Sequence, residues 1–182
     1  EIVRWRRHIH ENPEVSAVLP NTCAYVTAEL RKMGYEPYPV GGGVVAMLDG
    51  KPDGKVILLR ADMDALPFLI DGKKKNIHAC GHDAHSAMLL AAASELVGKV
   101  KRGTLRILFQ QGEETLKGAL AVIDAGVIED VDIALGLHIR PVQDIAYGEM
   151  SPAVRHASST FVNVVINGLS SHGARPHLGV NA

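Results

Sequence analysis

The chain has 182 residues, of which 47% are hydrophobic and 21% charged, a composition typical of one compact globular domain with a piece of a second. Its net charge of −1 at pH 7 gives no electrostatic reason to expect binding to nucleic acid or to an anionic membrane. The apolar stretches are far shorter than the roughly 18 residues that a membrane-spanning helix requires. Two cysteines are too few for a disulfide scaffold, so we expect a reduced, cytoplasmic setting.

The first third of the chain alternates between helical and strand patterns. Apolar residues with helical spacing predict helices over residues 2–11 and 22–33, the second with Asn21 or Thr22 as its cap. Strands are predicted on both sides of a glycine turn at 41–43 and again after a polar turn at 49–54. Their ranges are 35–40, 44–48 and 56–60.

The middle of the chain predicts a helix over 86–100, a strand over 104–109, a helix over 118–125 and a strand over 131–135. Together with the strand at 56–60, this order predicts an α/β fold with a mostly parallel sheet flanked by helices. Functional residues in such sheets lie beyond the carboxyl ends of the strands. Asp62, Glu113 and His138 occupy such positions.

The sequence changes character near residue 156. Residues 158–167 mix apolar and small polar side chains and predict the first strand of another domain, which a Gly/Ser turn and His172 follow. We therefore expect one domain over residues 1–156 and the beginning of a second over 157–182.

Metal-binding side chains are concentrated in the eight-residue string at 78–85, His-Ala-Cys-Gly-His-Asp-Ala-His. Cys80 and His82 can reach one metal ion if the backbone is extended or kinked at Gly81. An isolated Cys-Gly-His would more often be a buried cysteine beside surface histidines, but further ligand-type residues at strand ends favour a metal site. His85 lies about one helical turn beyond His82, and we expect it to be structural or to support a ligand.

Carboxylates follow two of the predicted strands. Glu113 and Glu114 would be a solvated charge pair in most loops. After a buried strand they can divide two roles that metal hydrolysis requires, one binding metal and the other moving protons. Asp62 and Asp64 share one side of a continued strand. They either cap a turn before Pro67, or one of them orients a ligand histidine.

Four segments carry a resemblance to a known family, at residues 60–67, 78–85, 109–114 and 136–138. They resemble the aminoacylase/carboxypeptidase family of two-metal peptidases. More narrowly, they are similar to its amidohydrolase branch, which includes N-acyl-amino-acid deacylases, hippurate hydrolases and auxin-conjugate hydrolases. The opening 6–14 and the late segment 168–177 extend the resemblance over nearly the whole chain. It implies a zinc-exopeptidase-like catalytic domain followed by the start of an α+β ferredoxin-like lid domain.

The resemblance also implies a metal centre. It would contain two divalent ions, which could be zinc, manganese or cobalt, and four residues of this chain would bind them. Cys80 would bridge the ions or bind the more tightly held one, and the further ligands would be His82, Glu114 and His138.

Three other residues receive roles from the same resemblance. Glu113 would be the general base that activates water and later protonates the leaving amine. Asp64 would orient a ligand. His172, on the lid, would hold the substrate or its oxyanion, in some members of the family across a dimer interface.

The implied function is hydrolysis of the amide bond in N-acyl amino acids or related small conjugates, by a homodimer joined through the lid. One alternative is a dipeptidase or carboxypeptidase of the same superfamily. A second is a hydrolase with Cys80 as nucleophile and His82 or His138 as base. A third is a non-catalytic module with a closed structural metal site, against which the neighbouring Glu113 argues.

Three features depart from the family pattern. Only ten residues, 68–77, separate Pro67 from His78, where the family has a longer loop. Residues 115–117 replace a glycine-rich stretch. The remaining lid and the returning half of the catalytic domain, with a last histidine ligand, are absent. We therefore expect the chain to be a fragment that is inactive by itself.

Overall fold

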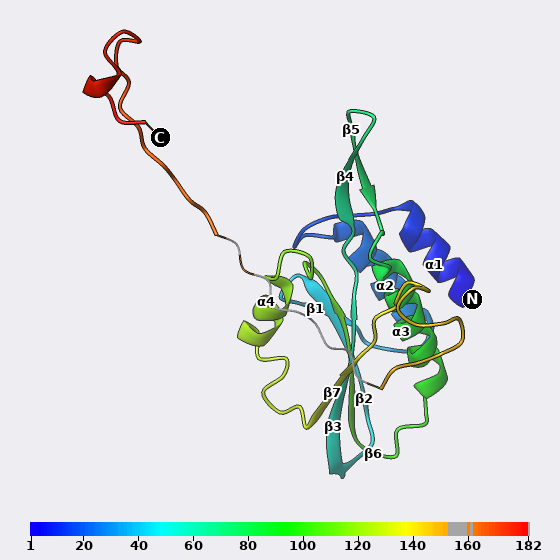
Figure 1. Cartoon of the computed structure of the whole chain (residues 1–182). Coiled ribbons are helices and arrows are strands. Elements are labelled where there is room, and N and C mark those ends of the chain that lie inside the picture. The colour runs from blue at the N-terminus through cyan, green and yellow to red at the C-terminus, as the bar shows by residue number, and fades with distance from the viewer. Residues whose placement is uncertain (153–159, 161, 182) are drawn as a thin grey trace. The chain divides into compact units, whose positions relative to one another are not determined.

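The structure, a computed structural model, describes residues 1–152, 160 and 162–181 (Figure 1). It divides into two units, Glu1–Pro141 and Val142–Ala182. The domain boundary predicted at residue 156 lies outside the described residues. Within the described part of the chain, no helix has the length and apolar character needed to cross a membrane.

The first unit is a five-stranded sheet with helices on both faces. Its helices are α1 (Ile2–Glu11), α2 (Pro20–Lys32), α3 (His82–Leu96) and α4 (Gly118–Asp124). The sheet strands are β1 (Tyr38–Val40), β2 (Gly43–Asp49), β3 (Lys51–Asp62), β6 (Arg102–Gln110) and β7 (Ile133–Gly136), in the order β1-β2-β6-β3-β7. β3 pairs in parallel with β6 and β7, whereas β1 and β2 join as antiparallel strands. The predicted α/β fold is therefore present, with its parallel part formed by the three strands that lead to the ligand-type residues.

Apolar side chains of the central strands alternate between the two faces of the sheet, as the pleat requires. In β6, Ile107 and Phe109 enter a core that includes Trp5 of α1. Leu108, between them, packs on the other face with Val122 of α4. Figure 1 accordingly shows α1, α2 and α3 together on one side of the sheet and α4 on the other. Both faces are covered, which explains why β6 has an almost continuous apolar sequence.

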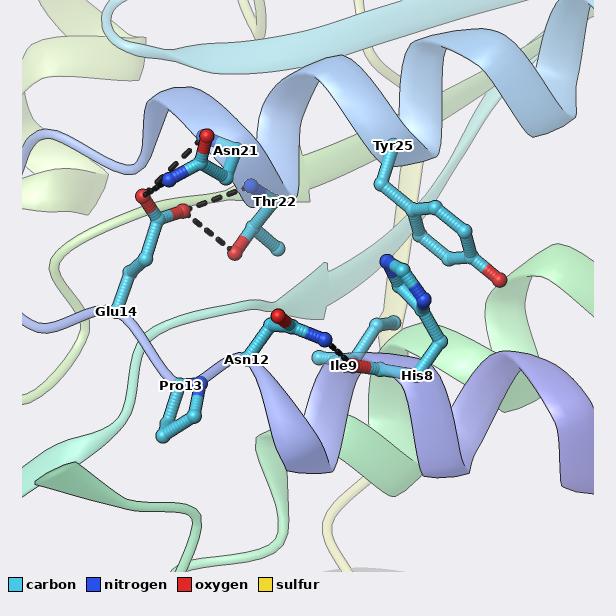
Figure 2. Close-up of a pocket in the computed structure, with 8 residues that line it drawn as sticks. All are labelled: His8, Ile9, Asn12, Pro13, Glu14, Asn21, Thr22 and Tyr25. Atoms are coloured by element: carbon cyan, nitrogen blue, oxygen red, sulfur yellow. Dashed lines mark hydrogen bonds between the residues drawn. The ribbon is translucent and has the colours of Figure 1, made fainter.

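The N-terminus of α2 is capped by a side chain from outside the helix. Both carboxylate oxygens of Glu14 accept hydrogen bonds from the start of α2, at 2.7 Å from the backbone nitrogen of Thr22 and 3.2 Å from that of Asn21. Figure 2 shows this contact at the edge of a cavity of about 340 Å³ between α1 and α2. The prediction that Asn21 or Thr22 caps the helix is wrong, because α2 begins at Pro20 and Glu14 satisfies the free N–H groups.

Three predicted boundaries also need correction. α3 begins at His82, four residues before the predicted start, because Gly81 ends the preceding loop in a left-handed conformation. β3 begins at Lys51, within the predicted turn, and pairs there with β6 across a bulge. β1 is shorter than predicted because Tyr35 is buried in the core, where its hydroxyl donates to the carbonyl of Ala93.

A hairpin that the sequence analysis did not predict lies directly before His78. It consists of β4 (Leu66–Ile70) and β5 (Lys73–Ile77), and Figure 1 shows it projecting from the sheet. Its two-residue turn, Asp71 with φ 51° and Gly72 with φ 72°, has the positive φ angles of a type I′ turn. Asp-Gly is a strong local signal for this turn, so the hairpin was predictable from the sequence.

The second unit has little regular structure in its described part. It contains a short 3₁₀ helix, η1 (Pro176–Leu178), and an isolated bridge between Leu169 and Val180. Residues 162–167, the described end of the strand predicted over 158–167, form no strand, while 158, 159 and 161 lie outside the described residues. A strand is stable only when paired, and this described segment has no strand partner.

Candidate metal centre

The ligand-type residues converge at one edge of the sheet. β3 ends at Asp62, β6 at Gln110 and β7 at Gly136, and because these strands are parallel their carboxyl ends share that edge. The N-terminus of α3 reaches the same place. Among the described residues, three groups of possible ligands have their donor atoms within 4.8 Å of one another, and His82 belongs to each. The groups are Cys80–His82–His138, His82–Glu113–Glu114 and Asp62–His82–His85.

Among the described residues, the buried side-chain atoms without a hydrogen-bond partner include two that face each other at this edge. They are Nε2 of His82 and Oε1 of Glu114, which lie 3.8 Å apart. Oε2 of Glu113 is 3.9 Å from the same ring nitrogen. Buried polar atoms are nearly always bonded, so a facing nitrogen and carboxylate oxygen without partners fit a cation between them. Nitrogen, sulfur and oxygen donors together suit a transition metal ion.

Cys80 completes this donor set. Its sulfur lies 3.3 Å from Nε2 of His138. Burial, followed by the negative charge of Glu114, raises the pKa of the Cys80 thiol to about 12. A catalytic cysteine is activated by a lowered pKa, so these surroundings argue against the cysteine-nucleophile alternative. A bound divalent cation would instead lower the pKa of the Cys80 thiol, since a thiol that coordinates a metal ion loses its proton.

Asp64 connects two of the proposed ligands. It accepts a hydrogen bond from Nδ1 of His82 at 3.3 Å and another from the backbone N–H of Glu114 at 3.0 Å. Burial opposes ionisation, but these two bonds hold the pKa of Asp64 below its usual value. With Nδ1 donating to Asp64, Nε2 of His82 is left to face Glu114. This geometry is that of a carboxylate which orients a ligand histidine.

The turn at Gly81 brings Cys80 and His82 to the same centre. Gly81 has φ +90°, and a Cβ atom there would collide with the side-chain methyl of Ile139. The left-handed backbone therefore favours glycine, and a larger residue would also have to displace the end of the Ile139 side chain. This agrees with the kink expected between the two residues.

Sequence reasoning did not identify the partners of two histidines in this region. His85 is paired with Asp62, its Nδ1 lying 2.6 Å from a carboxylate oxygen. Arg6 and His10, both on α1, contact the buried Asp83 at 2.8 Å, Arg6 in an ion pair and His10 through a hydrogen bond of its Nδ1. The sequence contained no spacing signal for these contacts, because the partners come from different elements.

His172 lies in the second unit. It is exposed, its Nδ1 accepts a hydrogen bond from the backbone N–H of Ala174, and its carbonyl accepts one from Arg175. Its predicted part in the chemistry stays a prediction.

The sheet and its edge thus define an α/β protein with a metal-type centre at the carboxyl ends of parallel strands. Residues 58–170, more than half of the chain, match the sequence model of a protein family described as peptidase family M20/M25/M40. The chain belongs to this family, which confirms the family expected from its motifs.

Individual relatives agree with this assignment. The chain is 37% identical to an N-acyl-L-amino acid amidohydrolase of Geobacillus stearothermophilus, over all of this chain and 52% of that protein. It is 38% identical to thermostable carboxypeptidase 2 of Saccharolobus solfataricus, over 97% of this chain and 48% of that protein. The crystal structure of the Bacillus subtilis YXEP protein, described as a dinuclear metal binding peptidase from the M20 family, superposes with a TM-score of 0.71 at 35% identity, covering 77% of this chain and 43% of that one. The chain therefore spans about half the length of the curated relatives it matches.

Proposed function

We propose that the whole protein containing this chain hydrolyses the amide bond of N-acyl amino acids or related small conjugates in a reaction that depends on two divalent metal ions. The observation that carries this proposal is the pair of partnerless buried atoms, Nε2 of His82 and Oε1 of Glu114. Cys80 and His138 supply further donors beside them. The match to the family and to a dinuclear metal binding structure supports two ions over one.

Each residue of the centre has a distinct part in this proposal. Bound divalent ions would supply Lewis acidity that lowers the pKa of water. The Glu113 side chain is 37% exposed, compared with 23% for Glu114. Glu113 is therefore the more accessible to substrate, and it would take the proton from the attacking water and return it to the leaving amine. Asp64 would keep His82 in the tautomer whose Nε2 is free to bind.

A carboxypeptidase is the second candidate, because a relative with that name is as similar to the chain as the amidohydrolase. Among metals, the Cys80 thiolate favours zinc or cobalt over manganese, since soft sulfur ligands suit the former. We also propose a cytoplasmic location, because the free thiol of Cys80 must stay reduced in order to bind metal.

The test is metal removal and replacement on the whole protein. Exhaustive chelation should abolish hydrolysis of N-acyl amino acids, and zinc, cobalt or manganese should restore it. Cys80→Ala should lose both activity and bound metal, measured by elemental analysis. Cys23→Ala is the matched control and should retain both, because the Cys23 thiol donates to the carbonyl of Gly42 and belongs to none of the three groups of possible ligands. Full activity after complete chelation would contradict the proposal, and preferential cleavage of C-terminal residues from peptides would favour the carboxypeptidase.

A further inference from the structure

Asp62 and His85 form a buried pair that metal binding does not use. Their exposed fractions are 0% and 2%. The backbone N–H of Ile139 donates to Nε2 of His85 at 2.9 Å, so this ring nitrogen is an acceptor and carries no proton. The proton is therefore on Nδ1, which donates to Asp62 at 2.6 Å. Both ring nitrogens are occupied, and His85 has no atom left for a metal ion.

Ile139 also determines how His138 is turned. Nδ1 of His138 lies 2.6 Å from the carbonyl oxygen of Ile139, and because a carbonyl only accepts, Nδ1 is the donor. In a neutral ring, Nε2 of His138 then carries the lone pair, and it lies 3.3 Å from the sulfur of Cys80. The N–H of Ile139 is held by His85 while its C=O orients His138. One residue thus connects the buried pair to a proposed ligand.

Within the described part of this chain, the segment that carries His138 has few other anchors in the core. β7 is an edge strand, and all four of its residues are exposed. Leu137 and Ile139, on either side of His138, are 59% and 42% exposed. Asp62, in contrast, is firmly placed, since Arg60 donates to its carboxylate at 2.7 Å and Ser86 donates to its carbonyl at 2.8 Å. The pair therefore ties the segment that follows β7 to the buried end of β3.

We propose that Asp62 and His85 are positioning residues for the metal centre. They hold the main chain at Ile139 so that Nε2 of His138 points towards Cys80. This inference rests on the proposed function, in which His138 and Cys80 bind metal. It assigns Asp62 and His85 to support of the centre, although their atoms lie close enough to those of His82 to suggest a ligand set.

The test measures metal affinity and the geometry of the bound metal in the whole protein. Cobalt(II) is the probe, because a cysteine ligand gives it a thiolate-to-metal absorption band. His85→Phe keeps the ring but removes both hydrogen bonds. We expect cobalt affinity, measured by competition with a chromophoric chelator, to fall about 10–100-fold, and the cobalt spectrum to change. Tyr35→Phe is the matched control: it removes a buried hydrogen bond, from the Tyr35 hydroxyl to the carbonyl of Ala93, that involves neither Asp62 nor His85, and it should leave affinity and spectrum unchanged.

A second variant keeps the proposal testable if His85→Phe does not fold. In Asp62→Asn, one carboxylate oxygen becomes an NH₂ group, which cannot accept the hydrogen bond that His85 or Arg60 donates there. This variant should therefore also lower the affinity for cobalt. Unchanged affinity and spectrum in either folded variant would overturn the positioning role and leave the metal centre intact. If the unmodified protein showed no thiolate-to-cobalt band, and Cys80→Ala bound cobalt equally well, the metal centre itself would fall, and this inference with it.

Discussion

Glu113 and Glu114 are neighbours in the chain but have different surroundings. Oε1 of Glu114 is buried without a partner, and the backbone N–H of Glu114 is held by Asp64. The side chain of Glu113 is the more exposed of the two. These differences at the scale of single residues give the two glutamates separate expected functions.

Substitution of each glutamate by glutamine should separate these functions. Glu113→Gln should retain metal and lower kcat by about 10²–10⁴-fold, the usual contribution of a general base. Glu114→Gln should instead weaken metal binding, because one carboxylate oxygen is replaced by an amide nitrogen that cannot coordinate. Steady-state kinetics with elemental analysis of both variants measures the two effects. The reverse pattern would exchange the assigned roles.

Gly81 permits a second test on a single residue. Gly81→Ala should destabilise the protein and weaken metal binding, because alanine is strained at φ +90° and its methyl would displace Ile139. Gly98→Ala is the matched control, since Gly98 also has a positive φ, +70°, but has open space around the missing Cβ. It should cost about 1 kcal/mol from backbone strain alone and leave metal affinity unchanged. Equal effects in the two variants, measured by urea unfolding and metal competition, would show that the Ile139 contact is unimportant.

At the scale of elements, a buried carboxylate on α2 contributes to the packing of α1 against α2. Glu29, 3% exposed, accepts hydrogen bonds from Trp5 at 2.7 Å, Arg4 at 2.8 Å and Lys32 at 2.7 Å. The first two donors are on α1, so Glu29 joins α1 to α2. Although burial favours the neutral form, these donors hold the pKa of Glu29 at about 2.

This contact predicts a pH-dependent contribution to stability. Glu29→Gln should reduce the free energy of unfolding by about 1–3 kcal/mol at pH 7, since a buried charged hydrogen-bond network is broken. The pKa of Glu29 is lowered by folding, so its contribution is present above the ordinary value of 4.5 and disappears as the pH falls towards 2. The difference between the two proteins in urea unfolding should therefore shrink over that interval. Glu95→Gln, at an exposed pair with Lys99, is the control and should change stability by less than about 0.5 kcal/mol at every pH.

At the scale of the whole molecule, we expect the second unit to take part in the reaction through His172. His172→Ala in the whole protein should lower kcat about 10²–10³-fold, the cost of losing one oxyanion donor, with little change in metal content. If His172 acts across a homodimer, mixing His172→Ala with Glu113→Gln subunits should restore some activity, since one hybrid site carries both intact residues. Undiminished turnover of His172→Ala would refute its role. Absence of rescue in verified mixed dimers would confine it to its own subunit.

The sequence by itself determined the family, the order of the main elements and which residues gather at the sheet edge. Strand-end positions of Asp62, Glu113 and His138 were sufficient for this, because parallel strands bring their carboxyl ends to one edge. The Asp-Gly signal of the hairpin is also local, so this element too was predictable from the sequence.

Only the tertiary structure decided which side-chain atoms are hydrogen-bonded and which are free to bind metal. The spacing of His82 and His85 could not show that one has a free nitrogen while both nitrogens of the other are bonded. Those bonds come from Asp64, Asp62 and Ile139, which lie on other elements. The Glu14 cap of α2 and the contact of Ile139 with Gly81 are decided in the same way. Local sequence encodes backbone preference and periodicity, whereas the partner of a buried polar atom depends on segments that meet only after the chain has folded.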